Sequence, residues 1–515
     1  MPRFLTLLLA GLTWTLFLSC GGEVVIQKSE QSGRDYKEVE KGDTLVVALR
    51  SSPHSFFLYK GQPMGYEYEM LSWMAQELGL HLKLTVPHSW SEIFSLVGHD
   101  KIDVIAAPLA MTVNSLHATV YTEHLYTTRP MLVQRKPKNW RKMSLHAVEK
   151  QVVRRPLDLL NKKVVVAEGS VYAKRLDHLG QELGGTILTG YVSAEVPIES
   201  LIVRVARGEM EYTVADEHIL QGWQAMYPDL DIHTPLGFEQ RIAWAVPQHK
   251  KKLLEKINAW IVSKRGRSDS RYNEIFARYF QSQGTFLRRM SSPYHSLGGG
   301  QLSPFDSLFK KYAALINWDW RLLAAMAFEE SGWNPQAQSP MGAVGLMQML
   351  PQTALEYGVN EPLNPSANLE AAVRYLASLE VFWKSLAPPE RQSFVMASFN
   401  AGPGHILDAV ALAKHYGQSG NEWKGAVSEW LLKKNQEKVY NHSVVKYGYC
   451  RGKQTVEYVR RIKERYIQFK LHSMELKKVS VDVYYPEWRN KHNPVNLILA
   501  QAPVLPNTTL VLRQE

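Results

Sequence analysis

One acidic residue at the end of an apolar helix pattern is the strongest candidate for chemistry in this sequence. Leu323 and Met326 recur at helical spacing, and Glu330 follows them by seven and four residues. A carboxyl group on such a face is costly to bury unless it is paired, or protonated and used as an acid. The alternative is that Glu330 lies at a frayed helix end in solvent.

A short helix and a loop must position this acid. The apolar spacing predicts a helix over residues 320–329, and the Asp319 side chain can cap its start. The residues that break the helix and bend the following chain are Gly332, Asn334, Pro335, Ser339, Pro340, Gly342 and Gly345. Such a loop could wrap a substrate around the carboxyl group.

The stretch 330–354 carries a dense pattern of matched positions. They are Glu330, Ser331, Trp333, Asn334, Pro335, Ala337, Ser339, Gly342, Ala343, Gly345, Leu346, Met347, Gln348, Pro351, Thr353 and Ala354. In order and type they closely resemble the signature of the lytic transglycosylases with a goose-type lysozyme fold. Residues 397–402 and 455–459 match two further motifs of that family. Phe399 departs from the pattern, because the family usually has Tyr there, and a Phe keeps the ring but loses the hydroxyl.

By this resemblance, the substrate is the glycan strand of peptidoglycan and Glu330 is the catalytic residue. Glu330 would protonate the oxygen between N-acetylmuramic acid and N-acetylglucosamine, then accept the proton of the muramoyl 6-hydroxyl, leaving a 1,6-anhydromuramoyl end. Most glycosidases use two carboxyl groups, and no Asp or Glu occurs in the following loop, 331–355, which agrees with a one-carboxylate mechanism. Apolar neighbours are expected to raise the pKa of Glu330. No cofactor or metal is expected.

The resemblance also implies supporting residues. Ser331, Ser339, Gln348 and Asn400 would bind the sugar, Gly345 and Met347 would shape the groove floor, and Tyr458 would lie near Glu330. Two other readings stay open. One is hydrolysis to a reducing end. The other is a tethered receptor that only binds glycan, which the Phe399 departure favours.

The length of 515 residues predicts two or more domains. Residues 43–282 read as α/β, with strands expected at 44–49, 101–107 and 163–167 and a helix at 68–80. Alternating strands and helices predict a mostly parallel sheet. Residues 303–475 read as helical. The expected fold is therefore multidomain, with a two-lobed α/β domain followed by a mainly α, lysozyme-like domain.

Several short segments of the α/β region match one family in order. These are 65–69, 103–107, Gly169-Ser170 and Ala215-Asp216, and they resemble the type-3 periplasmic solute-binding proteins. By resemblance Asp216 would hold an amine, with Gly169 and Ser170 as donors. Ser115 stands where amino-acid-binding members have the Arg that binds the ligand carboxylate. A muropeptide is therefore a better candidate ligand than a free amino acid. The alternative is a spacer that binds nothing.

The N-terminus reads as a targeting segment, with Arg3 before an apolar run that ends near Ser19. Residues 17–20 resemble a bacterial lipobox, which makes Cys20 the expected lipidation site, 1–19 the signal peptide and 20–42 the tether. The expected location is the periplasmic face of the outer membrane. The alternative is an ordinary secretory signal. Cys450, the only other cysteine, is expected to be a packed side chain.

The remaining segments carry no chemistry. Residues 283–302 read as a flexible linker, and 476–515 form an extension of unknown role. The net charge is +11, but no nucleic-acid motif is visible, and nucleic acid is not an expected partner. The basic clusters at 249–252 and 264–267 are expected to be solvated helix faces.

Overall fold

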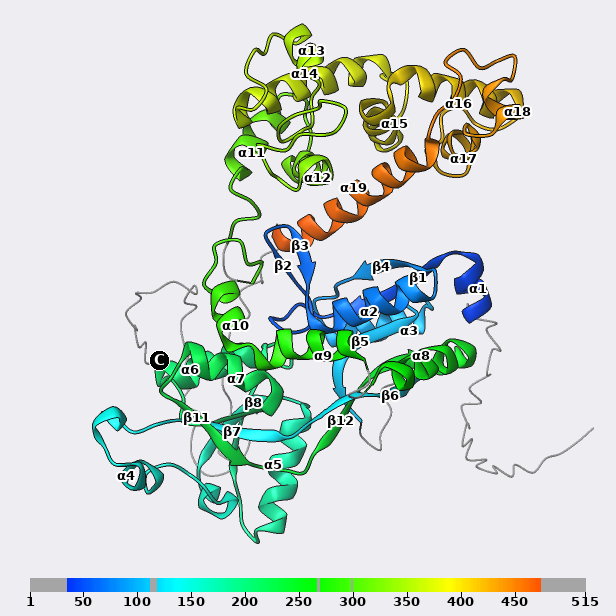
Figure 1. Cartoon of the computed structure of the whole chain (residues 1–515). Coiled ribbons are helices and arrows are strands. Elements are labelled where there is room, and N and C mark those ends of the chain that lie inside the picture. The colour runs from blue at the N-terminus through cyan, green and yellow to red at the C-terminus, as the bar shows by residue number, and fades with distance from the viewer. Residues whose placement is uncertain (1–34, 112–117, 266–268, 298–299, 474–515) are drawn as a thin grey trace, which may run out of the picture.

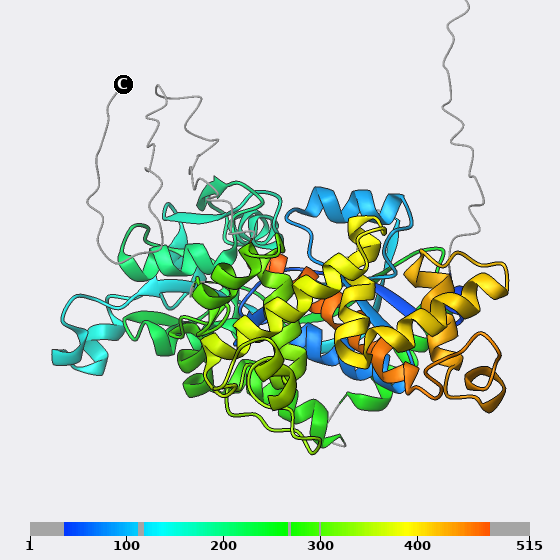
Figure 2. The same ribbon diagram turned by 90° about the horizontal axis from the view of Figure 1, so that it is seen from above.

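The computed structural model describes residues 35–111, 118–265, 269–297 and 300–473. Cys20, Ser115, the signal segment 1–19 and the extension 476–515 lie outside the described residues. The described chain folds into a two-lobed α/β domain and a helical domain that overlies it (Figures 1 and 2). The expected multidomain architecture is therefore confirmed.

The first lobe is built on a five-stranded sheet in the order β4-β1-β5-β12-β6. Its strands are β1 (Thr44–Leu49), β4 (His81–Thr85), β5 (Val104–Ala110), β6 (Thr119–Thr128) and β12 (Gln240–Pro247). The strand β1 runs parallel to β4 and β5, with Thr44 opposite His81. The strand β12 runs antiparallel to both β5 and β6. A short hairpin, β2 (Phe57–Tyr59) and β3 (Gln62–Met64), extends from this lobe towards the second domain (Figure 1).

The second lobe has an antiparallel sheet, β10-β7-β11, and a parallel pair, β8 with β9. Its strands are β7 (Pro130–Arg135), β8 (Lys163–Ala167), β9 (Leu188–Val192), β10 (Thr213–Asp216) and β11 (Leu230–Pro235). The prediction of a mostly parallel sheet was wrong. The chain enters this lobe through β6 and β7 and returns through β11 and β12, so the returning strands run against their neighbours.

Helices cover both lobes. They are α1 (Tyr36–Lys41), α2 (Tyr66–Glu77), α3 (Trp90–Gly98), α4 (Leu145–Glu149), α5 (Val171–Glu182), α6 (Ile198–Arg207), α7 (Glu217–Met226), α8 (Lys251–Lys264), α9 (Ser270–Phe276) and α10 (Gln283–Met290), with the short 3₁₀ helices η1 (Trp140–Lys142) and η2 (Pro156–Leu159) and the π-helical segment η3 (Ala277–Gln281). Several begin at a side-chain cap. Ser170, for example, accepts the Ala173 amide at the start of α5.

The second domain is helical. Its elements are α11 (Asp306–Ala314), α12 (Trp320–Ser331), α13 (Pro351–Glu356), α14 (Pro365–Phe382), α15 (Pro388–Ala401), α16 (Pro403–His415), η4 (Trp423–Val427), α17 (Ser428–Lys433), α18 (Glu437–Tyr440) and α19 (Gly452–Ser473). Four consecutive helices, α13 to α16, start with proline. Proline fits the first helical turn because a backbone N–H there has no acceptor within the helix, so its absence costs nothing. Within the described residues, no helix combines the length and apolar character that crossing a membrane requires.

Residues 283–297 are not part of the flexible linker that composition predicted for 283–302. Residues 283–290 form α10, whose Phe286 is buried and stacks on His54 of the first lobe with ring centroids 5.3 Å apart. Further on, the Ser296 amide donates to the Leu58 carbonyl at 2.9 Å, and Tyr294 accepts from the Lys60 amide at 3.1 Å. Aromatic packing and backbone pairing therefore dock this segment on the first domain.

One lysine of the basic cluster 249–252 is buried, contrary to the expectation of a solvated face. The Lys250 side chain is 0% exposed, and its Nζ lies 2.6 Å from Asp100 Oδ1 and 2.8 Å from Asp103 Oδ1. Asp103 also accepts the Val46 amide. Burial of this ammonium is tolerated because two carboxylates compensate its charge.

Candidate active site

The acid Glu330 lies at the last turn of α12, as the apolar spacing predicted. Residues 322–328 of this helix are all buried, Asp319 caps its start through the Arg321 amide, and Gly332 ends it at a φ of +61°. Glu330 is half-buried at the margin of this core. The helix therefore delivers a carboxyl group to the edge of an apolar interior.

Tyr458 of α19 is the hydrogen-bond partner of this acid. Its hydroxyl donates to Glu330 Oε1 at 2.5 Å. The pKa of Glu330 is raised to about 7. Burial is the main cause, the Tyr458 hydrogen bond opposes it, and the negative charge of Glu329 adds to it. A carboxyl group in this state can give up and take back a proton near neutral pH.

The loop after α12 is held by Asn368, a residue that sequence reasoning did not single out. Its amide Nδ2 donates to the carbonyls of Val344 at 3.0 Å and Pro362 at 2.8 Å, and its Oδ1 accepts the Met347 amide at 2.7 Å. The side chain is fully buried in α14. The available signal was an amide among apolar helix positions, which burial makes costly unless every polar atom is paired.

Gly345 is required by this packing. Its φ is +81°, and a Cβ there would lie 2.4 Å from Asn368 Nδ2 and 2.5 Å from the Pro362 carbonyl oxygen. Met347 was expected on the groove floor together with Gly345, but the structure buries the Met347 side chain completely. The loop turns this apolar side chain into the core, so Met347 can shape a groove only from beneath, and its role there stays a prediction.

Three polar side chains that were expected to bind sugar make hydrogen bonds within the loop. The Ser331 hydroxyl donates to the carbonyls of Ala327 and Leu346, at 3.1 and 2.8 Å. Ser339 Oγ accepts the Ala343 amide at 3.0 Å. Gln348 Nε2 donates to the carbonyls of Ala337 and Gly345, at 3.1 and 3.0 Å. These contacts fix the loop beside Glu330.

Asn400 and Phe399 end α15 near α19. Asn400 is exposed, and its Oδ1 accepts from the Thr455 hydroxyl at 2.8 Å. The Phe399 ring packs on Tyr375 with centroids 5.4 Å apart. Although Phe399 has no hydroxyl, Glu330 still has a hydrogen-bond donor, because Tyr458 supplies one.

The candidate ligand groups of the first domain lie in its second lobe. Asp216 is at the end of β10, is 8% exposed, and its Oδ1 has no hydrogen-bond partner among the described residues. Burial raises the pKa of Asp216 to about 6, against the opposing hydrogen bond of Tyr172. Gly169 is exposed, and the Ser170 hydroxyl caps α5.

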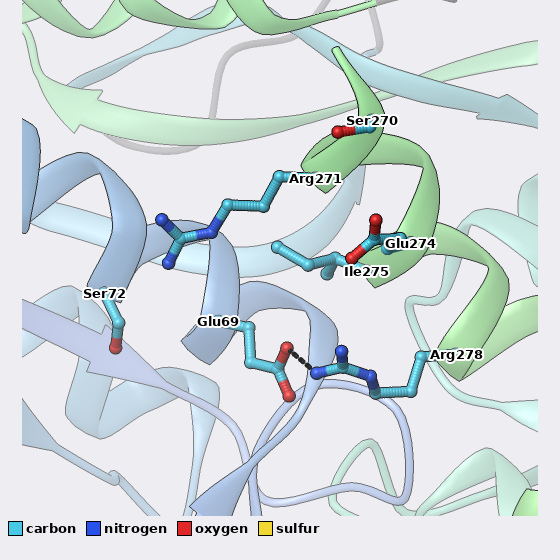
Figure 3. A pocket seen from close by; sticks show the side chains of 7 residues that line it. All are labelled: Glu69, Ser72, Ser270, Arg271, Glu274, Ile275 and Arg278. Atoms are coloured by element: carbon cyan, nitrogen blue, oxygen red, sulfur yellow. Dashed lines mark hydrogen bonds and ion pairs between the residues drawn. The ribbon is translucent and has the colours of Figure 1, made fainter.

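Two hollows in the described structure lie away from Glu330. One, of about 400 Å³, lies between α2 and α9, where Figure 3 shows Glu69 of α2 paired with Arg278 at 2.5 Å. The other, of about 460 Å³, lies between α2 and β4 of the first domain and Arg460, Glu464 and Gln468 of α19. The second hollow shows that α19 borders the first domain.

Comparison with protein families agrees with the two halves of this fold. Residues 45–282 match the bacterial extracellular solute-binding proteins, family 3, and residues 307–421 match the transglycosylase SLT domain. The fold and the site thus define a protein with a solute-binding-protein-like domain fused to a transglycosylase domain.

Relatives cover most of the chain. Proteins named membrane-bound lytic murein transglycosylase F from Desulfosudis oleivorans and Shewanella pealeana are each 30% identical, over 82% and 87% of this chain respectively and 89% of their own lengths. The chain belongs to this membrane-bound lytic murein transglycosylase F family. A solved structure of a mutant of ArgBP from T. maritima is 20% identical, covers 48% of this chain and 99% of its own, and has a TM-score of 0.38.

Removing the Tyr458 hydrogen bond is expected to change the pKa of Glu330. In Tyr458→Phe the ionised form of Glu330 loses a donor, so its pKa is expected to rise above about 7. Carboxyl carbon NMR titration of the full chain measures this, with the signal assigned by Glu330→Gln. Tyr466→Phe is the matched control, because Tyr466 lies on α19 and donates to Asp319 instead. An unchanged or lower pKa in Tyr458→Phe contradicts the account.

Proposed function

We propose that this protein is a lytic transglycosylase that cleaves peptidoglycan glycan strands, with Glu330 as its single acid and base. The observation that carries the proposal is a half-buried carboxyl group whose pKa is about 7, hydrogen-bonded to Tyr458. The family of the chain agrees with this chemistry.

In this reaction Glu330 first donates a proton and then accepts one. Protonated Glu330 gives its proton to the oxygen between N-acetylmuramic acid and N-acetylglucosamine, and the bond from that oxygen to muramoyl C1 breaks. The carboxylate then accepts the proton of the muramoyl 6-hydroxyl, and the oxygen of that hydroxyl bonds to C1. The 1,6-anhydro ring forms, no water is consumed, and Glu330 ends protonated. A pKa near the working pH suits both transfers.

The other residues support this step in different ways. The exposed Asn400 side chain can bind the sugar or its acetamido group through its Nδ2. Ser331, Ser339 and Gln348 act through the loop they hold. A receptor that only binds glycan has no need of a carboxyl group kept protonated by burial, so the enzyme is the better-supported reading.

Replacing the acid tests the proposal. Glu330→Gln keeps the shape but removes the ionisable proton, so cleavage of purified sacculi is expected to fall by about 10²-fold or more. Mass spectrometry of the products should show anhydromuramoyl ends with the native protein. Glu356→Gln, an exposed acid of the same domain, is the control. Reducing muramoyl ends would make the protein a hydrolase, and undiminished cleavage by Glu330→Gln would remove its central residue.

We further propose that domain 43–282 binds a muropeptide and regulates domain 303–475. The support is Asp216, whose buried carboxyl group has one oxygen without a hydrogen-bond partner among the described residues. An amine of the ligand can donate a hydrogen bond to this oxygen. Gly169 and Ser170 lie at the start of α5, where backbone donors and the hydroxyl can meet the same ligand.

Calorimetric titration with stem peptides and with free amino acids tests this ligand. An ammonium group binds the ionised form of Asp216, so affinity should fall as pH drops below about 6. Asp216→Asn should abolish binding, while Asp229→Asn, at an exposed position, should not. Binding without any change in cleavage rate would leave a targeting role, and no binding of either ligand class would favour a spacer.

Finally, we propose that Cys20 is acylated and holds the protein at the periplasmic face of the outer membrane. The support is the lipobox-like sequence before Cys20, together with relatives named membrane-bound. In Cys20→Ala the protein is expected to move to the soluble fraction or to keep its signal segment. Processed Cys20→Ala that stays with the membrane would place the anchor elsewhere.

A further inference from the structure

The tip of the β2–β3 hairpin touches the second domain beside the acid. Lys60 and Gly61 form the turn, with φ of 51° and 72°. A Cβ on Gly61 would lie 2.5 Å from Trp333 Cη2 and 3.1 Å from Phe328 Cδ2. The backbone of the first domain thus packs on two aromatic rings of the second, at a distance that only glycine allows.

Arg465 of α19 joins this turn to the residue before the acid. Its Nη1 donates to the Gly61 carbonyl at 3.1 Å, and its Nη2 lies 2.8 Å from Glu329 Oε1. The guanidinium also lies 3.8 Å from the centroid of the Phe328 ring. The Arg465 and Glu329 side chains are only 17% and 8% exposed, so water screens their pairing weakly.

We propose that Arg465 is a positioning residue through which the β2–β3 turn of the first domain fixes the place of Glu330. One planar guanidinium bridges the two domains, and its fork geometry ties a carbonyl of one to a carboxylate of the other. Because Glu329 immediately precedes Glu330, any shift of the turn that moves Arg465 also moves the backbone that carries the acid. The chemical meaning of this link rests on the proposed function.

The charged groups near Glu330 supply a matched control. Glu329 lies on α12, while Arg461 and Arg465 both approach it from α19, and Tyr458 faces the acid as a neutral donor. Arg461 Nε donates to Glu329 Oε2 at 2.8 Å, but among the described residues Arg461 makes no hydrogen bond or ion pair with the first domain. Each arginine compensates the charge of Glu329, and Arg465 alone carries the link.

Four full-length variants test the link: Arg465→Met, Arg461→Met, Gly61→Ala and Gly184→Ala. Gly184 has a φ of +69° and open space around its Cβ position, so its substitution reproduces the backbone strain of Gly61→Ala without the clash. Gly61→Asn, which tolerates positive φ better, replaces Gly61→Ala if that variant unfolds. The readouts are the pKa of Glu330 from carboxyl carbon NMR, and kcat and KM on sacculi.

Removing either arginine is expected to raise the pKa of Glu330, because the charge of Glu329 is then less compensated. Arg465→Met should also lower kcat more than it raises KM, by about two- to thirtyfold. Gly61→Ala should shift the pKa in the same direction, and Gly184→Ala should not. In the Gly61→Ala background, Arg465→Met should change the pKa of Glu330 and kcat less than it does in the native protein. Arg461→Met should change the pKa of Glu330 by the same amount in both backgrounds.

Two results overturn the proposal. One is a Glu330 pKa that is the same in Gly61→Ala and Gly61→Asn as in Gly184→Ala. The other is full additivity of Gly61→Ala with Arg465→Met. The NMR readout does not depend on cleavage. If the native protein cleaves nothing but Gly61→Ala shifts the pKa, the proposed function fails and the link stands.

Discussion

The site in the second domain depends on one constraint, a carboxyl group whose pKa is raised to about 7 at the margin of an apolar core. Ionising Glu330 there costs free energy because water is displaced from it. Fixed hydrogen bonds within the loop keep the surroundings in place, with Asn368 at their centre. The Tyr458 hydroxyl favours the ionised form and limits how far burial shifts the equilibrium. The proposed proton transfer in both directions requires this balance.

Helix α19 ties this balance to the rest of the molecule. Its first half brings Tyr458 to the acid and Thr455 to Asn400, and its second half brings Arg465 to the first domain. The hollow beneath it is bordered by α2 and β4. One straight element thus serves the site and the domain contact, so neither can be repositioned without the other.

Local patterns in the sequence predicted local structure well. The bounds of β1 and β8 and the helix that carries Glu330 follow from apolar spacing and a cap. The direction of β12, the docking of 283–297 and the burial of Lys250 were missed, because each depends on partners far along the chain; Asp103 is 147 residues from Lys250. Tyr458, 128 residues from Glu330, came from family resemblance, and Asn368 and Arg465 were not found.

The late position of α19 in the chain has a consequence for biosynthesis. Glu330 is translated well before residue 458, so a growing or prematurely ended chain carries the acid without the hydroxyl that tunes it. Arg465 comes later still, after the turn at Gly61 has long been made. The order of translation therefore leaves the proposed active site around Glu330 unassembled until almost all of the described chain exists. A nonsense mutation before α19 would leave a fragment with the acid but without its tuned environment.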